Sequence, residues 1–206
     1  MKVYFQIGTN VANDSFFLNV RRNNPDLIIL VEPFKCNFKS IHDCYKGYNY
    51  KLIEGIIHGE KHEEDVSIFL PANDVTRTMH ATLTPDKVWG HEGVVGDQPG
   101  ELQPITVKAF NFNTLCKELK IDEIECLCID TEGYDNVIIN SIDFEKIQIN
   151  MIVTEKWGWC PSTDTNTEDA PLFGKPGEMF IAEKLSKQNY IREEHRTDYI
   201  YKLLKL

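Results

Sequence analysis

The 206-residue sequence has no long apolar run, no basic stripe and no CxxC pair. A membrane-spanning helix needs about 20 consecutive apolar residues, so we expect no membrane partner. The N-terminus does not show the basic, apolar and small-residue regions of a signal peptide in that order. The formal net charge is −10 at pH 7. Without a basic surface to neutralise phosphates, nucleic acid is not expected as a partner.

The six cysteines do not have the spacing of a disulfide framework. Cys126 and Cys128 fall inside an apolar, strand-like run. They point to the same face of that strand, where buried thiols are expected rather than a redox pair. This usage is typical of a reducing compartment, so we predict a cytoplasmic protein.

Apolar and amphipathic segments alternate along the chain, which has 42% hydrophobic and 26% charged residues. Length and composition are typical of one globular domain, expected to span residues 1–206. Strands are expected at 3–7, 27–31, 50–57, 66–70, 105–110, 124–129, 147–153, 190–193 and 199–203. Helices are expected at 14–22, 37–45, 134–141 and 177–189, together with a helix through residues 115–119 that is capped by Asn113 or Thr114.

Strands alternating with helices predict a mostly parallel α/β sheet, and the last two strands are expected to form an antiparallel edge. The strands at 50–57 and 66–70 are expected to pair as a hairpin. Two irregular stretches, 71–104 and 157–176, interrupt the pattern. Because long loops in compact domains are usually functional, we interpret both as insertions over a pocket.

Polar residues follow four of the expected strands. Residues 8–10 follow the first strand, Glu32 the second, residues 130–133 a later one and Glu155 the strand after that. The carboxyl ends of parallel strands lie at one edge of a sheet. Several carboxylates at that edge predict a ligand site there.

Glu32 follows Gly8 by 24 positions. A carboxylate at the end of the second strand accepts hydrogen bonds from ribose hydroxyls, which fits a nicotinamide cofactor and S-adenosylmethionine equally. Gly8 permits a sharp turn and the close approach of a ligand. A dinucleotide loop has the pattern GxGxxG, but here Gly8 stands alone and Asp14 adds an acid. Such a turn favours a zwitterionic sulfonium over a dianionic pyrophosphate.

Four segments are similar, in order, to the motifs of the FkbM family of S-adenosylmethionine-dependent methyltransferases. They read FQIGTN at 5–10, VEP at 31–33, TL at 114–115 and CIDTEGYD at 128–135. The corresponding family patterns include DVGANxG, VEP and KIDVEGAE. The resemblance implies a Rossmann-like, class I methyltransferase sheet. That sheet has seven mostly parallel strands, an antiparallel C-terminal hairpin and helices on both faces.

The sequence departs from the family patterns at four positions. Gln6 replaces the acid of the first motif, and Ala12 replaces its second glycine. Cys128 replaces a lysine, and Asp135 replaces a glutamate.

The resemblance also implies a cofactor site. Gly8 and Asn10 would line the methionine moiety of S-adenosylmethionine, and Glu32 would hold its ribose. The backbone around Ile56 would flank the adenine. The full set of expected cofactor-binding residues is Gly8, Thr9, Asn10, Asp14, Glu32, Ile56 and Asp130.

Catalysis is expected on the acceptor side of this site, where a hydroxyl acceptor must lose its proton to a base. By the resemblance, Asp130 and Glu132 lie beside the methyl group and the acceptor, with Glu132 nearest the acceptor. The candidate bases are Glu132, Asp130, Glu155 and the loop histidines His80 and His91. An alternative interpretation makes Asp130 and Glu132 a helix N-cap and a first-turn acid.

No metal site is expected. His58 and His62 are four residues apart, a spacing that suits a metal only on a helix, and their flanks predict a turn. The remaining possibility is a magnesium or calcium ion bound by oxygens of Asp130, Glu132 and Glu155.

The sequence therefore predicts an S-adenosylmethionine-dependent methyltransferase that acts on an oxygen of a small molecule or sugar. A second hypothesis, motivated by Gln6, Ala12 and Cys128, is a binding module that keeps the fold and binds cofactor without turnover. A third is a nicotinamide-dependent oxidoreductase, which the glycine-poor loop disfavours. No motif identifies the acceptor or the oligomeric state.

Overall fold

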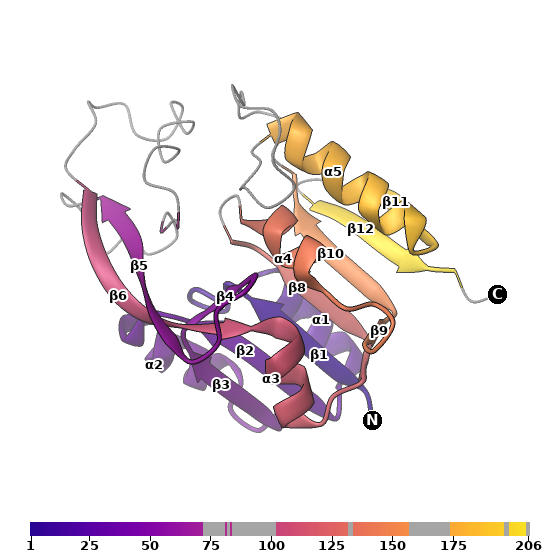
Figure 1. The fold of residues 1–206 in the computed structure, drawn as a ribbon. Helices are drawn as coiled ribbons and strands as arrows, with labels where there is room; N and C mark the ends of the chain where they lie inside the picture. The colour runs from indigo at the N-terminus through magenta and orange to yellow at the C-terminus, as the bar shows by residue number, and fades with distance from the viewer. Residues whose placement is uncertain are drawn as a thin grey trace.

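A seven-stranded sheet forms the centre of the protein in a computed structural model that describes residues 1–71, 81, 83, 102–131, 134–156, 174–195 and 198–204 (Figure 1). The strand order is β11 (Tyr190–His195), β12 (Asp198–Leu203), β10 (Met151–Glu155), β8 (Cys126–Ile129), β1 (Val3–Ile7), β2 (Leu27–Glu32) and β3 (Tyr50–Glu54). Within this sheet, β12 runs antiparallel to both of its neighbours and the other pairs are parallel. The predicted mostly parallel sheet with an antiparallel C-terminal hairpin is confirmed.

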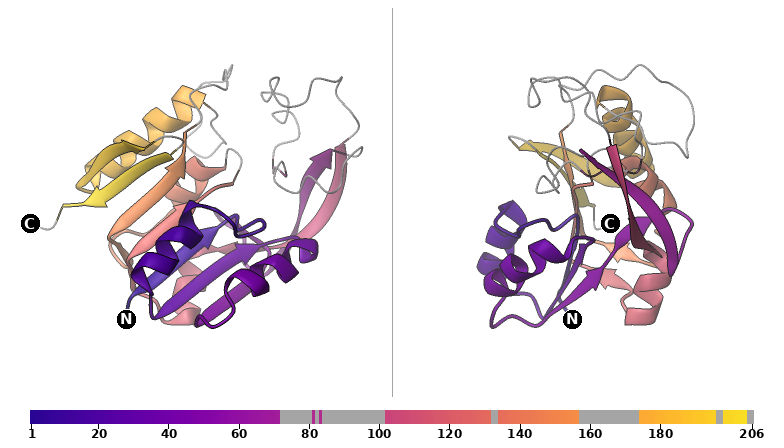
Figure 2. Two further views of the ribbon diagram at one scale, coloured as in Figure 1. Left: turned by 180° about the vertical axis from the view of Figure 1, so that it is seen from behind. Right: turned by 90° about the vertical axis from the view of Figure 1, so that its left-hand side faces the viewer.

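Helices cover both faces of this sheet, as predicted (Figure 2). One face carries α1 (Ser15–Asn23) and α2 (Lys35–Cys44). The other carries α3 (Phe112–Leu119), α4 (Asp135–Ser141) and α5 (Gly174–Lys187).

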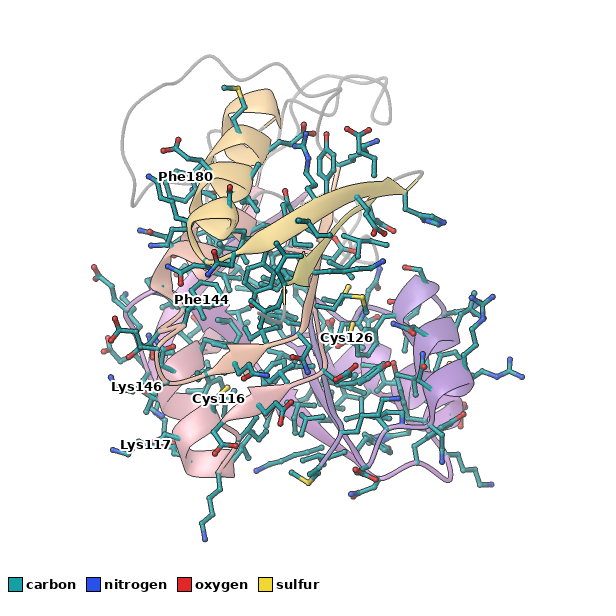
Figure 3. The ribbon with its side chains drawn as sticks, turned by 90° about the vertical axis from the view of Figure 1, so that its right-hand side faces the viewer. Cys116, Lys117, Cys126, Phe144, Lys146 and Phe180 are labelled. Carbon is teal, nitrogen blue, oxygen red and sulfur yellow. The ribbon has the colours of Figure 1, made fainter. Side chains whose placement is uncertain are left out.

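The sheet separates two apolar cores. Phe5 of β1 belongs to the core under α3, α4 and α5, whereas the neighbouring Tyr4 belongs to the core under α1 and α2. This follows from the alternation of side chains along a strand. Figure 3 shows the same division for Cys116, on the α3 side, and Cys126, on the α1 side.

Three further strands form a second sheet, in the order β4 (Ile56–His58), β6 (Leu102–Asn111) and β5 (Glu64–Pro71). Figure 1 shows β5 and β6 extending away from the central sheet. Both β4 and β5 pair with β6, so the expected hairpin between residues 50–57 and 66–70 is wrong. The predicted strand divides at Gly55 into β3, which pairs with β2, and β4, which pairs with β6. Residue 55 is glycine because a Cβ atom there would lie 2.4 Å from the carbonyl oxygen of Lys108.

Two strands predicted as continuous are each divided by a bend. Residues 124–129 form β7 (Glu123–Ile124) and β8, and residues 147–153 form β9 (Gln148–Ile149) and β10. β7 and β9 pair with each other outside the central sheet. The side-chain amide of Asn150 joins the two bends by donating to the carboxylates of Glu123 and Glu125.

The N-cap of α1 lies at the predicted start of the helix, whereas the N-cap of α3 differs from the predicted one. Asp14 caps α1 and accepts a hydrogen bond from the backbone N–H of Phe17 at 2.8 Å. The N-cap of α3 is Asn111 and not Asn113 or Thr114. Asn111 accepts from the N–H of Thr114 at 3.1 Å, so the helix begins two residues earlier than a cap at Asn113 would allow.

The irregular stretches predicted at 71–104 and 157–176 lie mostly outside the described residues. At their ends, β6 already includes residues 102–104, and α5 begins at Gly174 instead of residue 177. In the described part of the chain, no helix is both long enough and apolar enough to cross a membrane.

Candidate functional site

A pocket lies at the carboxyl ends of β1, β2 and β8, the edge at which the sequence predicted a site. Its empty volume, counted together with the open solvent at its mouth, is about 710 Å³. Its polar side chains include Asn10, Glu32, Asp130 and Thr131. Its apolar side chains include Phe34, Ile56, Ile57, Ile68, Ala81 and Leu83. The lining thus suits a ligand with both polar and apolar parts.

Gly8 forms the turn from β1 into the pocket. Its φ is 82°, and its N–H donates to the carbonyl oxygen of Val31 at 3.1 Å. A Cβ atom here would lie 1.8 Å from the carbonyl oxygen of Asp130. The glycine is therefore required by the close approach of two backbones, in addition to any approach of a ligand, and this packing brings Asp130 to the pocket.

Thr9 and Asn10 complete the turn in different ways. Thr9 is buried, and its hydroxyl donates to the carbonyl oxygen of Val31 at 3.2 Å. It stabilises the turn and is not part of the pocket lining. Asn10 lines the pocket with a left-handed φ of 47°. Its N–H donates to Oε2 of Glu32 at 2.7 Å, which links the turn to the end of β2.

Glu32, the last residue of β2, is only 3% exposed. Besides the bond from Asn10 to Oε2, its Oε1 accepts from the backbone N–H of Phe34 and the side-chain amide of Asn37, both at 3.0 Å. Burial raises the pKa of Glu32, while these three bonds act in the opposite direction. A carboxylate has about four acceptor sites, so one remains for a ligand.

Asp14 is not among the residues that line the pocket. Its carboxylate caps α1 and also accepts a hydrogen bond from the side-chain amide of Gln6, which is 1% exposed. An acid at position 6 would place a second carboxylate against Asp14, and like charges at this distance repel. The amide of Gln6 therefore suits the presence of Asp14.

The turn after β8 carries Asp130 and Thr131, which both line the pocket. The N-cap of α4 is Tyr134, so the alternative interpretation of Asp130 as a helix cap is wrong. Asp135, 4% exposed, accepts hydrogen bonds from both the N–H and the hydroxyl of Thr131. These bonds connect the turn after β8 to the first residue of α4. Glu132 lies outside the described residues.

Glu155 ends β10, the strand beside β8, and is not part of the pocket lining. Its register partner on β12 is Asp198. The next residue, Lys156, pairs with Glu194 at 2.8 Å and lies 5.0 Å from the ring centre of Tyr199. Glu155 therefore lies at the same edge of the sheet, next to a cluster of charged and aromatic side chains.

The model of the methyltransferase FkbM domain matches residues 6–170. The match covers more than half of the chain and includes the strand ends that form the pocket. The chain belongs to the FkbM methyltransferase family. The resemblance inferred from the four motifs is thereby confirmed. A search of curated proteins gave no match.

The pocket of this FkbM domain brings together most of the residues predicted for the cofactor site. Those lining it are Gly8, Asn10, Glu32, Ile56 and Asp130. Thr9 and Asp14 instead support the turn after β1 from outside the lining.

The sequence did not predict the apolar wall that the second sheet adds to the FkbM pocket. Ile68 of β5 is 2% exposed, lines the pocket and packs in one cluster with Phe34 and Leu83. The alternation of Val66, Ile68 and Leu70 is a signal for one buried face. It does not indicate what that face covers, so only the structure identifies this wall.

His58 and His62, which were considered as metal ligands, have different hydrogen-bond partners. His58 accepts two backbone N–H bonds at its Nδ1, and burial lowers its pKa. His62 pairs with Glu118 at 3.1 Å. Within the described ranges, no group of three His, Cys, Asp or Glu side chains could hold a metal ion. His80 and His91 lie outside these ranges.

Proposed function

We propose that the chain transfers a methyl group from S-adenosylmethionine to a hydroxyl oxygen of a small molecule or sugar. The observation that carries the cofactor assignment is Glu32, a carboxylate that is 3% exposed and borders the pocket. None of its described hydrogen bonds comes from a cation. Leaving a buried acceptor without a hydrogen bond is costly, and these three bonds leave one acceptor site of the carboxylate open. This favours a ligand whose hydroxyl donates to that site.

The mixed polar and apolar lining of the pocket supports this cofactor. Glu32 would accept hydrogen bonds from the ribose, and Gly8 and Asn10 would line the methionine moiety. The apolar side chains Phe34 and Ile56 would flank the adenine. When bound, S-adenosylmethionine supplies an electrophilic methyl group on a sulfonium.

We assign the acceptor side to Asp130, Glu132 and Glu155. In a displacement reaction, holding the reacting groups in place supplies much of the rate enhancement. A hydroxyl acceptor must also lose its proton, and a carboxylate near the turn after β8 would take it. Asp130 follows β8 and Glu155 ends β10, and both are carboxylates, which supports an oxygen acceptor.

We also propose that the protein works in the reducing environment of the cytoplasm. All five described cysteines are free thiols, and three of them are buried. Free thiols are typical of that compartment.

Titration calorimetry with S-adenosylhomocysteine tests the cofactor assignment. We expect Glu32→Ala to weaken binding about tenfold or more, since hydrogen bonds to a charged group contribute roughly 1.5–3 kcal/mol. Glu54→Ala is the matched control, because Glu54 is the register partner of Glu32 on β3 and pairs with Lys35 at the surface. No binding by the wild type, or equal effects of the two substitutions, would contradict the assignment.

Turnover needs a separate assay with hydroxyl-bearing acceptors. Methylated product that is lost in Asp130→Ala would support an enzyme. Binding of S-adenosylhomocysteine without any product from a broad acceptor panel would support a binding module.

A further inference from the structure

Asn37 lies in the first turn of α2 and is 6% exposed. It does not line the pocket, and it belongs to none of the motifs that carry the family resemblance. Its side-chain nitrogen donates to Oε1 of Glu32 at 3.0 Å and to Oδ1 of Asn10 at 3.4 Å. One buried amide therefore contacts two side chains that do line the pocket.

We propose that Asn37 is a positioning residue that orients Glu32 and Asn10 toward the cofactor. This inference rests on the proposed function, because it concerns how the same pocket holds its ligand. Asn37 acts through its two neighbours and makes no contact with the ligand itself.

The hydrogen bonds of Glu32 define what Asn37 does to the carboxylate. Each carboxylate oxygen has about two acceptor sites. Oε1 uses both, for Phe34 and Asn37, whereas Oε2 uses one, for the N–H of Asn10. The free site is therefore on Oε2, where a ribose hydroxyl would donate. Without Asn37 the carboxylate would have a second free site on Oε1 and its orientation would be less restricted.

The contact with Asn10 has a similar effect. Oδ1 of Asn10 faces the Asn37 amide, so the side-chain nitrogen of Asn10 is left to donate to a ligand. Asn37 thus helps to present one acceptor and one donor to the same pocket.

Among the described residues, no charged group donates a hydrogen bond to Glu32. Lys35 on α2 and Glu54 on β3 pair with each other at 3.0 Å, and Asp130 lies on the turn after β8. The pKa of Glu32 is governed by burial and by its three N–H donors. Because Asn37 is one of the donors that lower this pKa, its loss should raise the pH below which the ligand is released.

Two substitutions test the proposal by calorimetry with S-adenosylhomocysteine across a range of pH. We expect Asn37→Ala to weaken binding about tenfold, the effect of one hydrogen bond to a charged group, and to shift the acid midpoint of binding upward. Asn37→Asp should weaken it further, because a carboxylate would then face Glu32. An acid in the first turn favours a helix, so Asn37→Asp should keep α2 folded while it loses affinity.

Asn113→Ala is the matched control. Asn113 also lies in the first turn of a helix, and its amide bonds to the carbonyl oxygen of Ser141 at 2.7 Å and the N–H of Asp143 at 2.9 Å. Should both Asn37 variants bind as tightly as Asn113→Ala, with an unchanged acid midpoint, the positioning role is overturned while the proposed function stands. A wild-type chain that binds no S-adenosylhomocysteine would overturn both.

Discussion

Gly8 is the residue at which the pocket depends most directly on backbone packing. The turn after β1 and the end of β8 approach so closely that a Cβ atom would contact the carbonyl oxygen of Asp130 at 1.8 Å. Two effects act together at this position, the left-handed φ of 82° and the collision. A second glycine allows the two effects to be measured separately. Gly47 has a φ of 93°, but no atom of the described residues lies within 4 Å of a Cβ atom built there.

We expect Gly47→Ala to lower the free energy of unfolding by roughly 1–2 kcal/mol, the cost of a left-handed residue. Gly8→Ala should lower it by a further roughly 1–3 kcal/mol, because the strands must move apart. Urea denaturation of both variants measures the difference. Equal losses would mean that the turn relaxes freely and that the contact with Asp130 does not restrict position 8.

Glu32 should make stability depend on pH. Burial raises its pKa above the ordinary value of 4.5, so the folded chain binds this proton more tightly than the unfolded chain does. The resulting stabilisation is complete below about pH 4.5 and is lost as the pH rises through the folded pKa. We therefore expect the free energy of unfolding of the wild type, minus that of Glu32→Gln, to fall over this interval and then to level off.

Urea denaturation at a series of pH values measures this difference, with Glu54→Gln for comparison at the neighbouring strand end. A difference that rises with pH would mean that the hydrogen bonds of Glu32 outweigh its burial.

At the scale of elements, the sequence predicted the central sheet and failed at the bends. Buried parallel strands have continuous apolar sequences. For this reason the strands predicted at 3–7 and 27–31 agree closely with the observed bounds of β1 and β2. Apolar runs alone do not show where a strand leaves one sheet for another. The bend at Gly55 depends on a close contact with Lys108, and the bend at Asn150 on a hydrogen bond to Glu123. Both partners are distant in the sequence, so the local residue pattern does not reveal these bends.

The same limit applies to the site. Gly8, Glu32 and Asp130 could be predicted because each lies at or just after the end of a strand, and strand ends of a parallel sheet converge. Asn37 and Ile68 could not, since one acts through Glu32 and the other reaches the pocket from the second sheet.

The second sheet should contribute to binding as an apolar wall. Ile68 and Val66 both belong to its core cluster, but of these two only Ile68 lines the pocket. We expect Ile68→Ala and Val66→Ala each to destabilise the protein by about 1–4 kcal/mol through lost packing. Ile68→Ala alone should weaken the binding of S-adenosylhomocysteine, by about tenfold for an apolar contact of this size. Calorimetry on both variants measures this difference. Equal affinities of the two variants would show that β5 does not contribute to ligand binding.

At the scale of the whole molecule, one sheet serves two cores, and each contains a buried thiol. Cys116 lies in the core under α3, α4 and α5, and Cys126 lies in the core under α1 and α2. Burial raises the pKa of both thiols to about 12. Since the thiolate is the reactive form, neither should react with an alkylating reagent while the protein is folded, whereas the exposed Cys36 should react at once.

The labelling of these thiols tests whether the two faces unfold together. Strands such as β1 contribute side chains to both cores, so neither core can open without losing strand packing for the other. We therefore expect iodoacetamide to modify Cys116 and Cys126 at the same rate as urea is increased, measured for each residue by mass spectrometry with Cys36 as the internal reference. Modification of one buried thiol at urea concentrations that leave the other protected would show that the faces open independently. In that case the pocket, whose strand ends belong to the shared sheet, could survive the loss of one helical layer.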